Sequence, residues 1–354
     1  MKGIRSLLSK LFLALFLTIV ISGCAFSAAP LSMVNKPIQD WILITKDPDA
    51  LPTPTPFQPI AKTPINTLAP TQDTIEDSEV QGEVGESLPK EFETPEGQIN
   101  ILLLGSDYRP GGGFRTDVIM LVGINTITNK VSVLSFPRDL CVYIPGTYSG
   151  YDLESCDRIN TAMQFGFQTT QNTFESNFGV KPDYYAMTNF QGFVTLIDNL
   201  GGVDVEVASN LTDECSLPQA SGGYCTMYAG TNSMNGATAL WYVRSRYSSS
   251  DYDRERRAQE MIQALFHRLL SLDTLNKIPS MFDVYSQYVE HNLPLDVVLA
   301  LGKVAANIDL NEDVYRETLE PPEVIDTRKS NGAYVSLPNH TYIDPIIQRA
   351  FFSE

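Results

Sequence analysis

Histidine is scarce in this 354-residue chain, and the three that occur lie far apart. His267, His291 and His340 are each isolated among residues predicted to be helical or loop, so no histidine-based catalytic triad is indicated. A Gly-Xaa-Ser-Xaa-Gly nucleophile elbow is absent from the sequence. The run Gly111-Gly112-Gly113 is not followed by the Lys-Ser or Lys-Thr of a P-loop. The sequence therefore does not indicate a serine hydrolase of the triad type or a P-loop nucleotide-binding protein.

Basic residues are also few, with 25 Lys and Arg against 42 Asp and Glu and a formal net charge of −17. A general nucleic-acid binder needs a basic face, so we expect no nucleic-acid partner. An acidic chain can still bind an anion where its arginines are concentrated. Here acids dominate the first hundred residues, and the arginines gather in a few later motifs.

The N-terminus is typical of an export signal. Lys2, Arg5 and Lys10 precede an apolar run, residues 11–21, that is short for a membrane span. The run ends in Ile21-Ser22-Gly23-Cys24, which resembles a bacterial lipobox, so residues 1–23 are predicted to be a lipoprotein signal peptide and Cys24 the lipidated residue. The alternative is an uncleaved N-terminal transmembrane helix. Both place the body of the protein outside the cytoplasm, on the outer face of the bacterial cell membrane.

Four cysteines remain when Cys24 is assigned to lipid, and they fall into two neighbourhoods. Pairing within each predicts disulfides Cys141–Cys156 and Cys215–Cys225 in an oxidising compartment. Four cysteines allow three pairings, and proximity favours this one. A zinc site is the alternative, but neither pair has CxxC spacing and no histidine lies near either.

Residues 24–97 show no periodic pattern and are predicted to be a disordered linker. Seven prolines alternate with threonines and an acidic run follows, a composition that cannot bury enough apolar surface to fold.

Residues 98–354 are predicted to form one domain. Apolar or β-rich runs at 99–104, 118–124 and 130–136 predict strands, the last two joined as a hairpin across 125–129. Strands are also predicted at 182–187, 203–207, 314–319 and 334–337, and helices at 158–178, 189–200, 235–243, 252–272, 294–308 and 344–352. Residues 213–230 are expected to be an irregular loop. This alternation predicts an α/β fold, a three-layer α/β/α sandwich around a mixed β-sheet.

Asp107 and Asp117 follow and open apolar strands, ten residues apart. Carboxylates brought together from neighbouring strand ends form a hard oxygen site suited to Mg²⁺, which takes substrate phosphates as further ligands. A planar guanidinium binds phosphate oxygens in a bidentate fork and stays charged. The arginines that could surround such a metal are Arg109, Arg115, Arg138, Arg158, Arg244, Arg246, Arg254 and Arg257.

Six motifs in order, spanning about residues 99–272, resemble the LytR-CpsA-Psr (LCP) family. They are GSDYR…RTDVIML, SFPRD, RINTA, DYYAMTNFQGFVTLIDNLGGVDV, MNGATALWYVRSR and DYDRERRAQEMIQAL. The resemblance implies an enzyme on the outer face of the membrane, a phosphotransferase that moves a glycopolymer from a polyprenyl-pyrophosphate carrier to peptidoglycan. It also implies a lipid tunnel lined by apolar residues such as Val194, Leu196 and Ile197.

Carried over residue by residue, the resemblance makes Asp107 and Asp117 the ligands of Mg²⁺, with Mn²⁺ as an alternative. It makes Arg115 and Arg138 catalytic, with Asp139 as a candidate to position or deprotonate the acceptor hydroxyl. The pyrophosphate ligands it implies are Arg109, Arg115, Arg138, Arg158, Arg244, Arg246, Arg254, Arg257 and Gln259.

The sequence departs from the family pattern at two positions. Arg158 stands where the family usually has Lys, and Ala258 replaces the first Gln of R-x-x-R-Q-Q, which leaves Gln259 as a possible substitute. Two alternative functions stay open, a polyprenyl-pyrophosphate hydrolase and a non-catalytic lipoprotein that binds polyprenyl phosphates.

Overall fold

The computed structural model describes residues 92–108, 114–246, 250–271, 282, 285–308 and 313–353. All of them belong to one compact unit, Ser78–Glu354. The predicted signal peptide, Cys24, nearly all of the predicted linker and Arg109 lie outside the described residues. No helix among the described residues is both long enough and apolar enough to cross a membrane.

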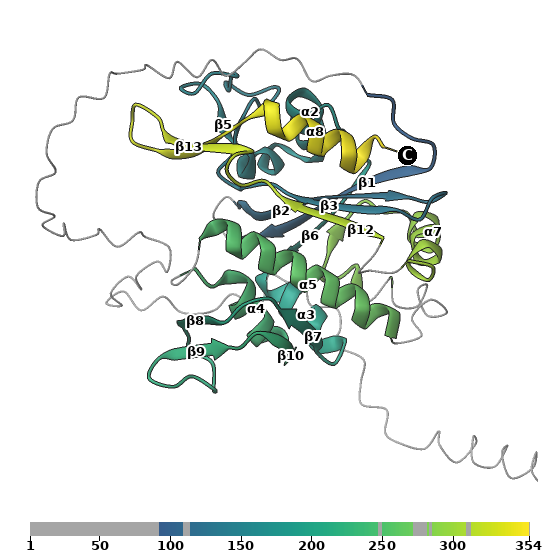
Figure 1. Ribbon diagram of the computed structural model, residues 1–354, viewed down its shortest axis with the longest axis vertical. Coiled ribbons are helices and arrows are strands. Elements are labelled where there is room, and N and C mark those ends of the chain that lie inside the picture. Colours follow the sequence, from purple (N-terminus) through teal and green to yellow (C-terminus); the bar gives the residue numbers. More distant parts are fainter. Residues whose placement is uncertain are drawn as a thin grey trace, which may run out of the picture. The chain divides into compact units, whose positions relative to one another are not determined.

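A six-stranded mixed sheet forms the centre of the fold, in the order β11-β6-β1-β2-β3-β12 (Figure 1). The strands are β1 (Gln98–Ser106), β2 (Thr116–Asn125), β3 (Val131–Ser135), β6 (Tyr184–Asn189), β11 (Glu290–His291) and β12 (Val314–Thr318). β2 is antiparallel to both β1 and β3, with Leu121 opposite Leu102 and Leu134, whereas β6 and β12 run parallel to β1 and β3. Four strands therefore end at the same edge of the sheet.

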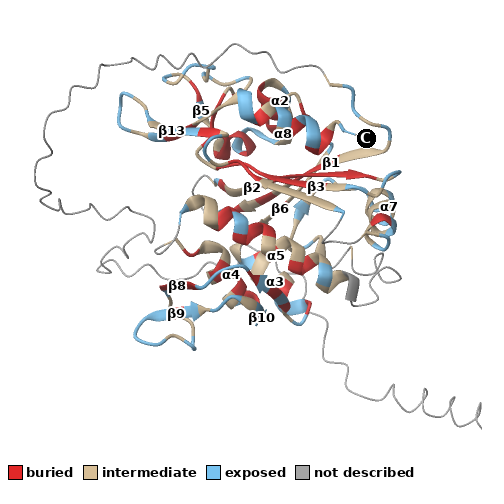
Figure 2. Cartoon of the chain, in the orientation of Figure 1, coloured by how far each residue is buried: buried red, intermediate tan, exposed pale blue. Residues whose placement is uncertain are grey.

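Helices cover both faces of the sheet, as Figure 1 shows, and this confirms the predicted α/β fold with a mixed central sheet. One face packs against the 3₁₀ helix η2 (Ile159–Phe165), α2 (Phe167–Phe178) and α8 (His340–Phe351). The other packs against α5 (Asp251–Ser271) and α7 (Leu295–Ala305). Because successive strand residues point to opposite faces, Leu102 joins the first core and Ile101 the second. Burial on both faces explains the nearly continuous apolar runs of the central strands (Figure 2).

A separate core lies beneath α5. It is formed by α3 (Phe190–Asn199), α4 (Gly236–Arg244), α5 and the paired strands β7 (Val203–Val207) and β10 (Gly230–Met234). Asparagine side chains cap both shorter helices. The Asn189 side chain accepts a hydrogen bond from the Gly192 N–H, and that of Asn235 accepts one from the Thr238 N–H.

Two local predictions were wrong, and one hairpin was predicted only in part. Residues 158–178 do not form one helix, because Gly166, with φ of 92°, separates η2 from α2 after the short β5 (Asp157–Arg158). Residues 213–230 are not wholly irregular, because β8 (Leu211–Glu214) pairs with β9 (Tyr224–Met227). The C-terminal hairpin of β13 (Val324–Arg328) and β14 (Tyr334–Pro338) was only half predicted, since the polar sequence of β13 gives little strand signal.

Both predicted disulfides are present. Cys141–Cys156 joins β4 (Cys141–Val142) to the residue before β5, and Cys215–Cys225 closes the β8–β9 hairpin. The pairing predicted from closeness in the sequence is therefore confirmed. The alternative of a zinc site is excluded for these four cysteines, because each is in a disulfide.

Candidate functional site

Charged side chains meet at the carboxyl edge of the central sheet, where β1, β3, β6 and β12 end and β2 begins. Ligands in α/β proteins commonly bind beside this edge, because the strands hold the following loops rigidly. We call the charged set here the arginine–aspartate network, and its members are Asp117, Arg138, Asp139, Arg158, Arg246, Asp251 and Arg254.

Arg138, three residues beyond β3, is the centre of the network. Its Nη1 lies 2.9 Å from Oδ1 of Asp117, and its Nε lies 3.3 Å from Oδ2 of Asp251. The same Nε is 3.4 Å from Oδ2 of Asp139. Burial opposes the charge of this guanidinium, but the attraction of the three carboxylates outweighs it and raises the pKa of Arg138.

Asp251 opens α5 and was missed by the sequence analysis. Its Oδ1 lies 2.5 Å from Nη2 of Arg246 and 3.6 Å from Nη1 of Arg254. Arg254 also donates through Nη2 to the backbone carbonyl of Asp117, at 3.0 Å. An acid three residues before an arginine on a predicted helix is the signal that could have identified Asp251, since this spacing pairs side chains on one face.

Burial sorts the arginines of the network into two groups. The side chains of Arg138, Arg158 and Arg246 are 20%, 31% and 32% exposed, whereas that of Arg254 is 5% exposed. Burial, together with the nearby charges of Arg138 and Arg254, lowers the pKa of Arg246, although Asp251 opposes this. A site holding so many cations is prepared for an anion, which would relieve their mutual repulsion.

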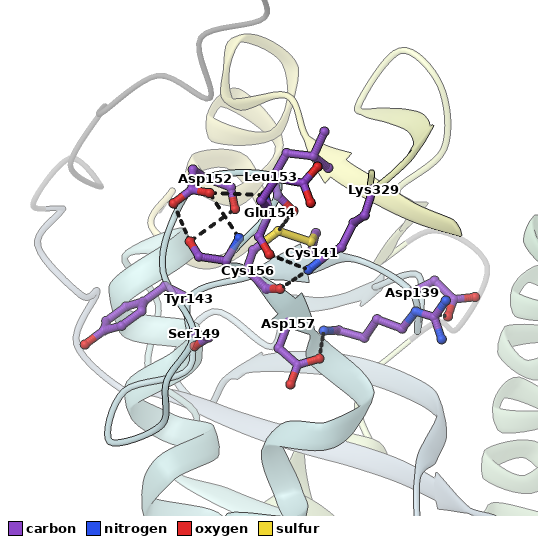
Figure 3. Close-up of a disulfide and its surroundings, with 12 residues drawn as sticks. Asp139, Cys141, Tyr143, Ser149, Asp152, Leu153, Glu154, Cys156, Asp157 and Lys329 are labelled. Carbon is purple, nitrogen blue, oxygen red and sulfur yellow. Dashed lines mark hydrogen bonds and ion pairs between the residues drawn. A yellow bond between two sulfur atoms is a disulfide. The ribbon is translucent and has the colours of Figure 1, made fainter. Parts of the chain in front are cut away.

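Arg158 is held by the C-terminal hairpin as well as by the network. Its Nε lies 3.1 Å from Oδ1 of Asp139, and its Nη2 donates to the carbonyl of Tyr334 at 2.5 Å. The Cys141–Cys156 disulfide, shown with Asp139 in Figure 3, ties the strand that follows Asp139 to the segment that carries Arg158. Lys329 of the hairpin turn donates to the carbonyl of Cys156 in the same view.

Asp107 and Arg115 stand at the base of the β1–β2 connection. Oδ1 of Asp107 accepts a hydrogen bond from the Arg115 N–H at 2.7 Å, and the Asp107 N–H donates to the Arg115 carbonyl at 3.0 Å. The Arg115 side chain is exposed. Because Ser106 lies opposite Thr116, this connection brings Asp107 near the start of β2 and Asp117.

The donor set of Asp107 and Asp117 fits Mg²⁺. Among the described residues, no group of three or more His, Cys, Asp or Glu side chains could hold a metal by itself. Mg²⁺ is commonly bound by one or two carboxylates, with water and substrate phosphates as the remaining ligands. Two carboxylates near the arginines of the network match that donor set, and their role as metal ligands stays a prediction.

Three of the predicted pyrophosphate ligands have other contacts. Arg244 stacks on the ring of Phe190, with its guanidinium carbon 4.2 Å from the ring centroid. Arg257 is buried and donates to the carbonyls of Tyr242 and Ser245, so it joins the end of α4 to α5. These contacts give Arg257 a structural role in holding the two helices together, rather than a role in binding phosphate.

Gln259 is likewise buried and structural. Its Nε2 lies 2.7 Å from both the Ser135 hydroxyl and the Glu317 carbonyl, so it bridges β3 and β12. Ala258, which replaces the family's first Gln, packs instead with Ile101 and Val122 on the sheet. The departure at Ala258 therefore adds apolar contact at the sheet and leaves Gln259 as an interstrand clamp.

An apolar cavity of about 410 Å³ lies along α5. Its walls are the second face of the sheet, α5 and α7, and they include Ile101, Leu103, Val122, Ile262, Phe266 and Leu301. Val194, Leu196 and Ile197, the residues expected to line a lipid tunnel, are absent from the lining of this cavity, and Ile197 is fully buried in the core beneath α5. Apolar periodicity could not separate the two, because core and cavity positions carry the same residue types.

The sequence model of the LytR_cpsA_psr family matches residues 65–350 and so begins inside the segment predicted to be a linker. Regulatory protein MsrR of Staphylococcus aureus (strain COL) is 32% identical over 211 residues, which cover 58% of this chain and 60% of that protein. The Polyisoprenyl-teichoic acid–peptidoglycan teichoic acid transferase TagT of Bacillus subtilis (strain 168) is 30% identical, over 62% of this chain and 68% of that protein. The chain thus spans about three fifths of the length of the first of these relatives.

Solved structures show the same fold. Bacillus subtilis TagV has a TM-score of 0.60 at 26% identity, over 72% of this chain and 98% of that one. TagT bound to LIIa-WTA has a TM-score of 0.56 at 25% identity, over 77% of this chain and 98% of that one.

Proposed function

This chain belongs to the LytR_cpsA_psr family, and from that premise we propose that it is a phosphotransferase acting on a polyprenyl-pyrophosphate-linked glycopolymer. It transfers the glycopolymer with one phosphate to a hydroxyl of peptidoglycan. The relatives named as polyisoprenyl-teichoic acid–peptidoglycan transferases support this reaction class.

One observation carries the proposal: the same helix, α5, contributes to both the arginine–aspartate network and the apolar cavity. Asp251 in the first turn of α5 belongs to the network, and Ile262 and Phe266 of the same helix line the cavity. A polyprenyl pyrophosphate has a strongly anionic head joined to a long apolar tail. The head therefore fits the arginines and the tail fits the cavity, in which burial of apolar surface stabilises it.

Arg138 and Arg246, two of the three partly exposed arginines of the network, hold the pyrophosphate, with Arg115 and Arg244 beside them. Arg254 lies beneath and fixes Asp117 and Asp251. The acceptor hydroxyl attacks the sugar-linked phosphorus in line, and the bond from that phosphorus to the bridging oxygen breaks. Polyprenyl phosphate leaves, and the fixed guanidinium groups stabilise the charge that develops on it.

Asp139 accepts the proton of the attacking hydroxyl and later releases it to water. Its two oxygens are held by different arginines, Oδ1 by Arg158 and Oδ2 by Arg138, so the carboxylate has a fixed orientation. A positioned base of this kind is what general-base catalysis requires.

Asp107 and Asp117 would hold Mg²⁺, with Mn²⁺ as a substitute. A bound ion would supply positive charge that neutralises phosphate oxygens. The Arg138 contact to Asp117 uses Oδ1, so one carboxylate links the metal ligands to the phosphate ligands.

We also propose that the protein acts outside the cytoplasm, anchored by a lipid on Cys24. The two disulfides support an oxidising compartment.

The experiment that tests the proposal uses the purified ectodomain with a synthetic polyprenyl-pyrophosphate-linked saccharide and Mg²⁺, with and without a peptidoglycan oligosaccharide. We expect the saccharide phosphate to appear on the acceptor. Release only to water would instead identify a hydrolase, and no release would leave a lipid-binding protein.

A further inference from the structure

Glu255 is a buried acid whose carboxyl group has no partner. The residue is 3% exposed, and within the described part of the chain neither carboxyl oxygen accepts a hydrogen bond. A buried polar group without a partner destabilises a protein, and native structures contain few of them. When such a group lies beside a binding site, the ligand is a candidate for the missing partner.

The position of Glu255 on α5 places it between the charged site and the cavity. Residues four apart on a helix share a face. Asp251, one turn before Glu255, contacts Arg138, and Gln259, one turn after it, contacts Ser135 and lines the cavity. Glu255 therefore faces the end of β3 at the junction between Asp251 of the network and Gln259 of the cavity lining, although Glu255 is not itself part of that lining.

The charged groups around Glu255 come from two elements, Asp251 and Arg254 on α5 and Arg138 and Asp139 on the loop after β3. Burial raises the pKa of the Glu255 carboxyl to about 8, although Arg254 opposes this shift. At neutral pH the group is thus a carboxylic acid, which has an O–H donor that a carboxylate lacks.

We propose that Glu255, in its neutral form, donates a hydrogen bond to the phosphate that is attached to the polyprenyl chain. This inference rests on the proposed function, because the ligand's head and tail must occupy the network and the cavity. With the chain in the cavity and the pyrophosphate on the arginines, the lipid-side phosphate lies at the junction that Glu255 faces. An ionised Glu255 would repel that phosphate, so the bound anion keeps the acid protonated.

Two substitutions separate the hydrogen bond from the shape of the side chain. Glu255→Gln keeps a neutral donor of nearly the same size, and Glu255→Met keeps the volume but removes the donor. The probe is geranylgeranyl phosphate, with its affinity measured by titration calorimetry at pH 7 in Mg²⁺. We expect Glu255→Gln to bind within about twofold of the wild type and Glu255→Met to bind about tenfold more weakly, the loss of one hydrogen bond to a charged group.

Folding does not account for such a difference, because removing a buried carboxyl without a partner favours the folded state. Thermal unfolding should show Glu255→Met to be at least as stable as the wild type. The wild type should also lose affinity for the probe above about pH 8, where Glu255 ionises, whereas Glu255→Gln should keep it. Equal affinity of the two variants, whether both bind tightly or both bind weakly, overturns the inference.

The outcome can be told apart from failure of the proposed function. If the wild type transfers no saccharide but the two variants differ in binding geranylgeranyl phosphate, the function fails and the role of Glu255 stands. If the wild type transfers saccharide and the variants bind equally, the function stands and this role fails.

Discussion

At the scale of single residues, the site is made specific by how each charged group is held. Arg138 contacts carboxylates from β2, from its own loop and from α5, so it is fixed from three directions. A guanidinium that cannot rotate stabilises developing charge without reorganising, which is the basis of electrostatic catalysis.

Arg138→Ala should abolish saccharide transfer, with a loss of about a hundredfold or more, because it removes the central phosphate ligand. The fold should be retained, since Arg138 is partly exposed, and circular dichroism with thermal unfolding checks this. Arg256→Ala is the matched control, because Arg256 lies on α5, which carries Asp251 and Arg254 of the network, but pairs instead with Asp253 and Glu320. Near-normal transfer by folded Arg138→Ala would remove Arg138 from the mechanism.

Asp117→Asn should weaken Mn²⁺ binding and raise the Mg²⁺ concentration needed for half-maximal transfer, because an amide is a poorer ligand for a hard cation than a carboxylate. Calorimetric titration with Mn²⁺ measures the first effect without substrate. Asp183→Asn is the control, because Asp183 is outside the network and its carboxylate accepts a hydrogen bond from the Asn100 N–H. Unchanged Mn²⁺ affinity in Asp117→Asn would contradict the proposed metal site.

Glu255 should also make stability depend on pH. The folded protein keeps this proton up to about pH 8, whereas in the unfolded chain the carboxyl group has its ordinary pKa of 4.5. Between those two values the folded state binds more protons, so the free energy of unfolding of the wild type falls as pH rises. The Tm advantage of Glu255→Met over the wild type should therefore grow from pH 5 to pH 8 and then level off. A constant difference across that range would show that Glu255 ionises in the folded protein as it does when unfolded.

At the scale of elements, the loop between Cys141 and Cys156 and the C-terminal hairpin hold two members of the network. β4 pairs with β5, which places Cys141 opposite Arg158. The Tyr334 carbonyl of β14 accepts a hydrogen bond from the Arg158 guanidinium. The C-terminal residues are thus part of the site and not an appendage, because β12 also completes the central sheet.

Replacing both Cys141 and Cys156 by Ser should lower the free energy of unfolding by about 3 kcal/mol, as expected for a loop of this length. It should also reduce kcat, because Asp139 and Arg158 lose the covalent link that holds their segments together. Replacing both Cys215 and Cys225 by Ser is the control, with a similar loss of stability but unchanged kcat, since that disulfide closes the β8–β9 hairpin. Equal kcat in the two double variants would show that the Cys141–Cys156 disulfide has no special role in the site.

At the scale of the whole molecule, the proposed function depends on two environments that share helix α5, a charged edge and an apolar cavity. The central sheet contributes to both environments. Its carboxyl edge carries the acids and arginines, and the face that packs against α5 and α7 forms one wall of the cavity. A soluble phosphate would use only the first environment, whereas a lipid-linked phosphate uses both.

Leu301→Trp should fill part of the cavity and so weaken binding of geranylgeranyl phosphate while leaving inorganic pyrophosphate binding unchanged. Leu301 on α7 lines the cavity, whereas Leu299 on the same helix is 37% exposed and absent from the lining, which makes Leu299→Trp the control. Calorimetry with both ligands measures the effect. Equal weakening of both ligands would indicate that the substitution disturbs the charged edge as well.

The sequence by itself determined much of the architecture. Strong apolar runs predicted β1, β2 and β3, and helical periodicity predicted α3 and α4 close to their observed bounds. It also determined the family and most of the charged residues of the site, because motifs that carry chemistry are local in the chain. The two disulfides followed from the spacing of the cysteines.

Only the tertiary structure decided what each charged residue does. The resemblance to the family implies that Arg257 and Gln259 bind phosphate. In this structure Arg257 instead joins α4 to α5, and Gln259 joins β3 to β12. Asp251 and Glu255 entered the site only through the packing of α5 against the end of β3. The cavity, too, was decided by packing, because a chain pattern shows which residues are apolar but not which of them face an unfilled space. Burial and partner geometry depend on residues more than a hundred positions apart, and this is information that no local pattern contains.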